Sequence, residues 1–169
     1  MRKYVVAIAC VIAFFMDSIL FGTVGIYNLR PDALCALFVS LGLLIGSMPA
    51  AAIGIPVGLL LDVLLNKYVG LSSLSFLGAA LAGGIFHNKF YADNIVIPSV
   101  TAAIVAFVKE HVMLIAVALS GGRIGSYVLT LAAHILPAAL LTGGLCALFH
   151  LVLKRTLFDP RHRKDIDER

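Results

Sequence analysis

Apolar runs alternate with short polar connections along most of the chain. A helix needs about 20 consecutive apolar residues to cross a bilayer. On that criterion the pattern predicts six membrane spans, at residues 4–22, 33–48, 50–66, 71–87, 95–119 and 127–153. The expected fold is therefore all-α: a polytopic, six-helix transmembrane bundle over residues 1–153, followed by a polar cytoplasmic tail over 154–169.

The boundary between the second and third spans is the least regular part of the pattern. Residues 33–66 could form one long tilted helix or two short ones. Pro49 and Pro56, with Gly42, Gly46 and Gly54, favour two helices with a break near 47-SMPA-50.

Basic residues give an independent test of the number of spans, because cytoplasmic loops are enriched in Lys and Arg. With six spans and a cytoplasmic N-terminus, nine basic residues lie inside and three outside, and Lys109 in the fifth span completes the 13. The inner nine are Arg2, Lys3, Lys89, Lys154, Arg155, Arg161, Arg163, Lys164 and Arg169, and the outer three are Arg30, Lys67 and Arg123. With five spans the balance becomes four inside to eight outside. The distribution favours six spans with both termini in the cytoplasm.

Composition supports a membrane protein. The chain is 61% hydrophobic and 13% charged, whereas soluble domains carry about 25% charged residues. The first apolar run, 4–22, is too long for the apolar part of a signal peptide and is better interpreted as a membrane helix. The net charge of +4 resides at the chain ends and in loops, so we expect no nucleic-acid partner. The three cysteines lie inside apolar segments, which argues against a disulfide framework or a zinc site.

Asp62 interrupts the apolar run 54-GIPVGLLLDVLLNKYVG-70. Gly54, Gly58 and Asp62 follow one another at four-residue spacing and fall near one face of a helix. An aspartate at mid-bilayer costs about 2.5–3.5 kcal/mol, and less near the interface. The cost is tolerable if the carboxylate reaches water, a helix N-terminus or a basic group. Asp62 could therefore fix helix depth and packing, or bind a partner protein.

Other charged residues also fall within the predicted spans. Asp17 lies in the outer third of the first span and could share a polar cluster with Arg30, Asp32 and Asp62. In the fifth span, Lys109, Glu110 and His111 are consecutive, and neighbouring helical residues point about 100° apart. At least one of these side chains should point into the bundle or toward another subunit. We favour a structural or interface role for them over proton transfer.

Recognised catalytic patterns are absent from the sequence. His134 and His150 are 16 residues apart, too far for joint ligation on one helix face, and no H-E-x-x-H, G-x-S-x-G or Walker motif occurs. Ser72, Ser73 and Ser75 have no paired histidine that would support an intramembrane serine protease. We therefore expect a non-enzymatic protein without a metal or cofactor.

Several short motifs occur in or beside the predicted spans. They are 30-RPD-32, 54-GIPVGLLLDVL-64, 70-GLSSLSFLGAALAGG-84, Glu110 and 136-LPAALLTGGLCALF-149. With the length and the six-span outline, they resemble the MreD family, the rod-shape-determining membrane proteins of bacteria, over nearly the whole chain. Lys109 departs from the family pattern, because it places a second charge beside the glutamate.

The resemblance implies a role in the bacterial inner membrane. MreD-like proteins work with the membrane-anchored protein MreC in the elongasome, which also contains MreB, the glycosyltransferase RodA and a class B penicillin-binding transpeptidase. Residues carried over as partner-binding or structural are Pro31, Asp32, Gly54, Gly58, Asp62 and Glu110. The implied function is a membrane scaffold that supports lateral peptidoglycan synthesis and cell shape, holding the MreC helix in a groove lined by small residues.

A second hypothesis follows from the fold that the resemblance implies, which is similar to the S-components of ECF vitamin transporters. A polar pocket would then be lined by Lys109, Glu110, His111 and His134, and Ala9-xxx-Ala13 would offer a small-residue ridge to a coupling protein.

Overall fold

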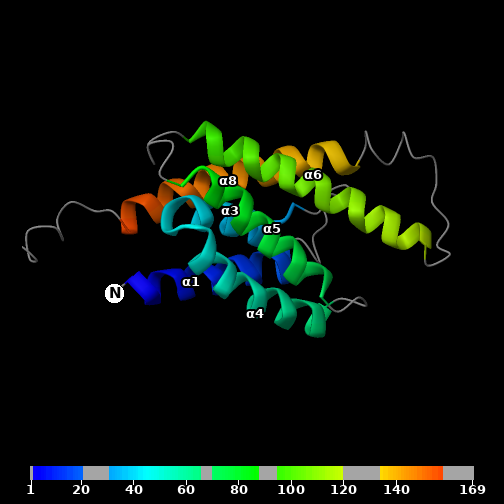
Figure 1. Ribbon diagram of the computed structural model, residues 1–169, viewed down its shortest axis with the longest axis horizontal. Coiled ribbons are helices and arrows are strands. Elements are labelled where there is room, and N and C mark those ends of the chain that lie inside the picture. Colours follow the sequence, from blue (N-terminus) through cyan, green and yellow to red (C-terminus); the bar gives the residue numbers. More distant parts are fainter. Residues whose placement is uncertain (1, 21–30, 66–69, 88–94, 120–133, 158–169) are drawn as a thin grey trace, which may run out of the picture.

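The computed structural model describes residues 2–20, 31–65, 70–87, 95–119 and 134–157 (Figure 1). Its helices are α1 (Arg2–Phe15), which continues into the π-helical η1 (Met16–Leu20), α3 (Ala33–Ile45), α4 (Ser47–Leu65), α5 (Leu71–Ile85), α6 (Val96–Leu119) and α8 (Leu136–Leu157). Within these ranges every element is helical, which confirms the all-α prediction.

Three of the helices are long and apolar enough to cross a membrane. The qualifying segments are Ser47–Leu64 in α4, Val96–Ile115 in α6 and Leu136–Thr156 in α8. The apolar segments of the other helices, Tyr4–Ser18, Ala33–Ile45 and Leu71–Ile85, are shorter. The structure thus supports a membrane protein, while the six-span arrangement and its orientation stay predictions.

The break between the second and third predicted spans is confirmed at Gly46. This glycine has a φ of +95°, a left-handed value that favours glycine, and α4 begins at the next residue. Pro49 lies in the first turn of α4, where a missing N–H is tolerated, and Pro56 lies inside the same helix. Gly46 therefore forms the break, and Pro49, which has no N–H to donate to the Ile45 carbonyl, also opposes continuation of α3.

The last helix differs from its predicted bounds of 127–153. Residues 127–133 lie outside the described part of the chain, and α8 continues to Leu157. Lys154 and Arg155 occupy its final turn, where positive charge interacts favourably with the helix dipole. The tail predicted to begin at residue 154 therefore starts inside a helix.

Helix α3 lies at the centre of the bundle, between α6 and α8 on one side and α1 and α4 on the other (Figure 1). It has only 13 residues, and those from Ala33 to Leu44 are all buried. A helix that is apolar on every side belongs in a core. The neighbouring helices shield α3 from the surroundings, so it need not have the length of a full membrane span.

Glycines bring the central helices into backbone contact. A Cβ atom on Gly42 would collide with the Ala80 carbonyl of α5, and one on Gly83 would collide with the Val39 carbonyl of α3. Small residues allow such approach, which in lipid replaces the hydrophobic drive between helices. The small residues of α5 therefore allow it to pack closely against α3 in a compact bundle.

Candidate functional site

Two side chains from different elements close the N-terminus of α3. Asp17 in η1 accepts hydrogen bonds from the N–H groups of Ala33 at 2.7 Å and Leu34 at 2.9 Å. Asp32, the N-cap residue, accepts one from the N–H of Cys35 at 2.8 Å. The N–H of Asp32 itself donates to Thr142 Oγ1 on α8 at 3.1 Å. All four N–H groups that a helix start leaves without intrahelical partners are thus satisfied inside the protein.

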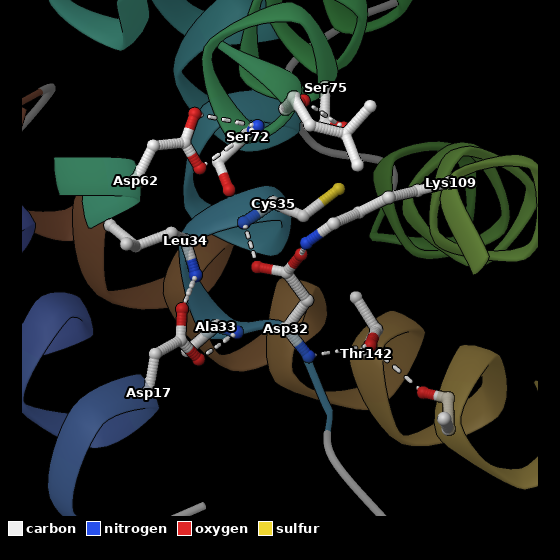
Figure 2. Close-up of polar contacts among 12 residues, drawn as sticks. Asp17, Asp32, Ala33, Leu34, Cys35, Asp62, Ser72, Ser75, Lys109 and Thr142 are labelled. Atoms are coloured by element: carbon white, nitrogen blue, oxygen red, sulfur yellow. Dashed lines mark hydrogen bonds and ion pairs between the residues drawn. The ribbon is translucent and has the colours of Figure 1, made fainter. Parts of the chain in front are cut away.

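Lys109 brings a positive charge to this helix end from the middle of α6 (Figure 2). Its Nζ forms an ion pair with Asp32 Oδ2 and lies 5.7 Å from the centroid of the Phe76 ring on α5. The lysine and aspartate side chains are 23% and 11% exposed. The N-terminus of α3 is therefore bonded to η1, α6 and α8. The Lys109 ammonium also lies over the Phe76 ring of α5.

The charges explain why a lysine is present. Asp17 and Asp32 both bond N–H groups of the same helix start, so two carboxylates lie at one helix end. The start of a helix is equivalent to about half a positive charge, which does not balance two carboxylates. Buried charge without a partner is strongly unfavourable. Lys109 therefore compensates negative charge that the N–H groups at this helix start do not balance.

The N-terminus of α5 is closed by one carboxylate. Asp62 near the end of α4 has no exposed surface and accepts hydrogen bonds from the N–H of Gly70 at 2.8 Å and of Ser72 at 3.0 Å. Gly70 is the N-cap residue and has no side chain to make this bond. Asp62 replaces the missing cap from a neighbouring helix, so it reaches a helix N-terminus, one of the three kinds of partner expected from the sequence.

The other two residues of the Asp62 face also pack inside the chain. A Cβ on Gly54 would lie 3.4 Å from the Phe38 ring, and one on Gly58 would lie 2.5 Å from Ser73 Cα. The expectation that this face receives a partner helix is therefore corrected: α3 and α5 of the same chain occupy it. The structural alternative accounts for Gly54, Gly58 and Asp62.

The remaining candidates lie near the first N-terminus. Pro31 is buried immediately before the N-cap residue. Glu110 is half-buried on α6 and follows Lys109, so it points about 100° away from the ion pair. Of the predicted polar cluster, Asp17 and Asp32 meet at α3 and Asp62 lies at α5 (Figure 2). Arg30 lies outside the described residues.

Two residues of the predicted vitamin pocket bond other groups of the chain. Lys109 is paired with Asp32, and His111 Nδ1 is bonded to the Phe107 carbonyl of its own helix at 2.9 Å. His134 is exposed at the start of the last helix. Ala9 and Ala13, the expected ridge for a coupling protein, are buried in the core, which corrects that expectation.

A groove of about 470 Å³ lies between α5 and α6. Its wall is almost wholly apolar and includes Ala82, Ile85, Ile97, Val100 and Thr101. The Thr101 hydroxyl donates to the Ile97 carbonyl at 2.8 Å. Ligand pockets need a few converging polar groups to orient their ligands, and the described wall of this groove does not supply them.

A polar pair that was not predicted lies deep in the core. Ser40 Oγ on α3 lies 3.3 Å from His150 Nδ1 on α8, and both residues have no exposed surface. The two positions are 110 residues apart, and only the fold brings them together. A substrate could not reach this serine without displacing packed side chains, so we interpret the pair as a polar contact between two helices.

Comparisons of the chain with protein-family models, curated proteins and solved structures find no match in any of the three.

Proposed function

We propose that this chain is a non-enzymatic membrane scaffold of the bacterial elongasome that binds MreC and supports lateral peptidoglycan synthesis and cell shape. The proposal starts from the MreD-like motifs of the sequence. On this view the protein contributes a rigid set of helices to an assembly, and the catalytic steps belong to RodA and the transpeptidase.

The observation that carries the proposal is the use of charge inside the bundle. Asp17, Asp32 and Asp62 close helix N-termini, and Lys109 compensates one of them. Ionisable groups at membrane depth usually mark transport or relay sites when they line a cavity. Here they bind backbone N–H groups and one another, which is what a rigid scaffold requires.

The outward faces are suited to association in lipid. Exposed apolar side chains cover the outer sides of α5, α6 and α8, among them Leu74, Ile104 and Leu148. Gly78 on α5 and Gly144 on α8 are also exposed, and a Cβ on either would meet no atom within 4 Å. Outward-facing small residues let a second helix approach closely.

The test is co-purification of a tagged chain with MreC from a rod-shaped bacterium depleted of its own MreD, with cell shape scored in parallel. We expect MreC in the purified complex and restored rods. Absence of MreC together with round cells, from a chain that is folded and inserted, would falsify the proposal.

Two matched variants refine the same experiment. Gly78→Leu and Gly144→Leu each fill an open position on one outward face, α5 or α8, and neither side chain meets the core. We expect one of them to lower MreC recovery and the other to leave it unchanged, which would locate the partner. Recovery of MreC at the parent level from both variants would exclude these two faces, and α1, α4 and α6 would then be tested.

A further inference from the structure

The faces of helix α6 differ in side-chain size and in their contacts with α8, where the Cys146 thiol donates to the Pro98 carbonyl at 3.3 Å and Gly143 packs closely on Ser99, but they do not differ in polarity. Its outward stripe contains Val96, Val100, Ile104, Val108 and Val112, which are 43–65% exposed. The inward stripe contains Pro98, Ala102 and Ala106, all buried. Both stripes are apolar, and lipid tails are as apolar as a protein core. The hydrophobic effect that orients an amphipathic helix in water therefore discriminates weakly between the two faces here.

Charge does discriminate between the faces of α6. Lys109 continues the inward stripe and meets Asp32, while Asp17 lies at the same helix end. The next residue is Glu110, and a rotation of α6 by one position would turn this carboxylate toward the two aspartates. Like charges at short distance in a low-dielectric site repel strongly. The correct rotation is thus favoured by an attraction and the neighbouring one is opposed by a repulsion.

We infer that the Lys109–Glu110 pair, set against the acidic N-terminus of α3, fixes the rotational register of α6 in the bundle. Lys109 selects the face that turns inward, and Glu110 excludes the adjacent one. The inference concerns how the bundle is specified and does not depend on MreC or on any partner.

The experiment measures which face of α6 meets lipid. Spin labels are placed singly at positions 100, 101, 103, 104, 105, 107 and 108 of the full-length chain in lipid bilayers, after replacement of the three native cysteines by alanine. The accessibility of each label to dissolved oxygen, which concentrates in lipid, is then recorded. In the parent chain we expect maxima at 100, 104 and 108, the exposed positions.

The test variant exchanges the two charges, Lys109→Glu with Glu110→Lys, at constant composition. The register inference predicts that the maxima move one residue along, to 101 and 105, as the new lysine turns toward Asp32. Lys109→Arg, which keeps the charge in place, is the matched control and should leave the maxima at 100, 104 and 108. Unmoved maxima in the exchanged chain would overturn the inference, since packing of the alanine stripe alone would then set the register.

A second variant decides the question if the exchanged chain does not fold. Lys109→Met with Glu110→Gln removes both charges, and Asp32→Asn is added so that no aspartate is left without its lysine while the N-cap bond is kept. The register inference predicts a flattened accessibility profile, because neighbouring rotations become similar in energy. A profile with the parent's maxima and amplitude would overturn it.

Discussion

The N-termini of α3 and α5 meet the same requirement with different amounts of charge. Each start is closed by a carboxylate from a preceding element, Asp17 for α3 and Asp62 for α5. At α5 the Asp62 carboxylate accepts hydrogen bonds from two N–H groups. At α3 a second carboxylate, Asp32, is added, and the ion pair with Lys109 accompanies it.

The two helix starts differ in the number of carboxylates that they hold. At both starts the N–H groups and the helix dipole favour the carboxylates that they bond. At the α3 start, where two carboxylates meet, a cation from another helix, Lys109, pairs with Asp32. The α3 start consequently links several helices, whereas the described bonds of Asp62 join only α4 and α5.

The largest expected effect is at the α3 start. Lys109→Met should lower the free energy of unfolding by about 3–5 kcal/mol, because breaking a buried pair leaves an uncompensated charge. Equilibrium unfolding in mixed detergent micelles measures this. The paired variant Lys109→Met with Asp32→Asn should recover most of the loss, since Asn still caps the helix. An equal loss in the single and the paired variant would show that the lysine stabilises by packing and not by charge.

The α5 start should be sensitive to the hydrogen bonds of its cap. Asp62→Leu leaves the N–H groups of Gly70 and Ser72 without their acceptor in a buried site, which should cost at least about 2 kcal/mol by the same unfolding measurement. Asp62→Asn keeps one acceptor oxygen and should cost about 1 kcal/mol. If the two variants lose the same stability, the charge of Asp62 matters and its capping bonds do not.

A third substitution tests the packing of α5 against α4 independently of the Asp62 cap. Gly58→Ala would push a Cβ to 2.5 Å from the Ser73 backbone, one turn from the capped start. Overpacking of this kind costs about 1–3 kcal/mol. Gly78→Ala on the exposed side of α5 is the control and should raise stability by about 0.5–1 kcal/mol, because alanine forms helix more readily than glycine and meets no atom there. Equal effects of the two substitutions in thermal unfolding would contradict the close contact of α4 and α5.

Much of the fold follows from local sequence, and much of the site does not. The apolar runs predict the helices, and Gly46 was among the residues that predicted the break between two of them. Both features depend on a few neighbouring residues. The length of α3 was overestimated, since a helix buried by its neighbours needs no full span. A helix N-terminus was among the possible partners of Asp62 because a carboxylate in an apolar run needs water, N–H groups or a cation, and the structure provides the N–H groups of Gly70 and Ser72.

The contacts around Asp32 depend on long-range packing. Lys109 is 77 positions from its partner, and Thr142 is 110 positions from the N–H that it accepts. A single apolar sequence carries no signal for such pairs, because every helix face has similar hydrophobicity. The Gly54–Gly58–Asp62 face was correctly identified as a contact surface, and only the structure shows that α3 and α5 lie against it.

The smallest expected effect tests the charge balance directly. Asp17→Asn removes one negative charge from the α3 start and keeps one acceptor for the N–H of Ala33 or Leu34. The lost bond costs about 1 kcal/mol, and the relieved repulsion with Asp32 offsets part of it, so the net change should be smaller than for Asp62→Asn. Asp17→Leu, which removes both acceptors, serves as the control and should cost clearly more. If Asp17→Asn is as damaging as Lys109→Met, the α3 start requires both carboxylates to be ionised, and Lys109 is then the counter-charge of Asp17 as much as of Asp32.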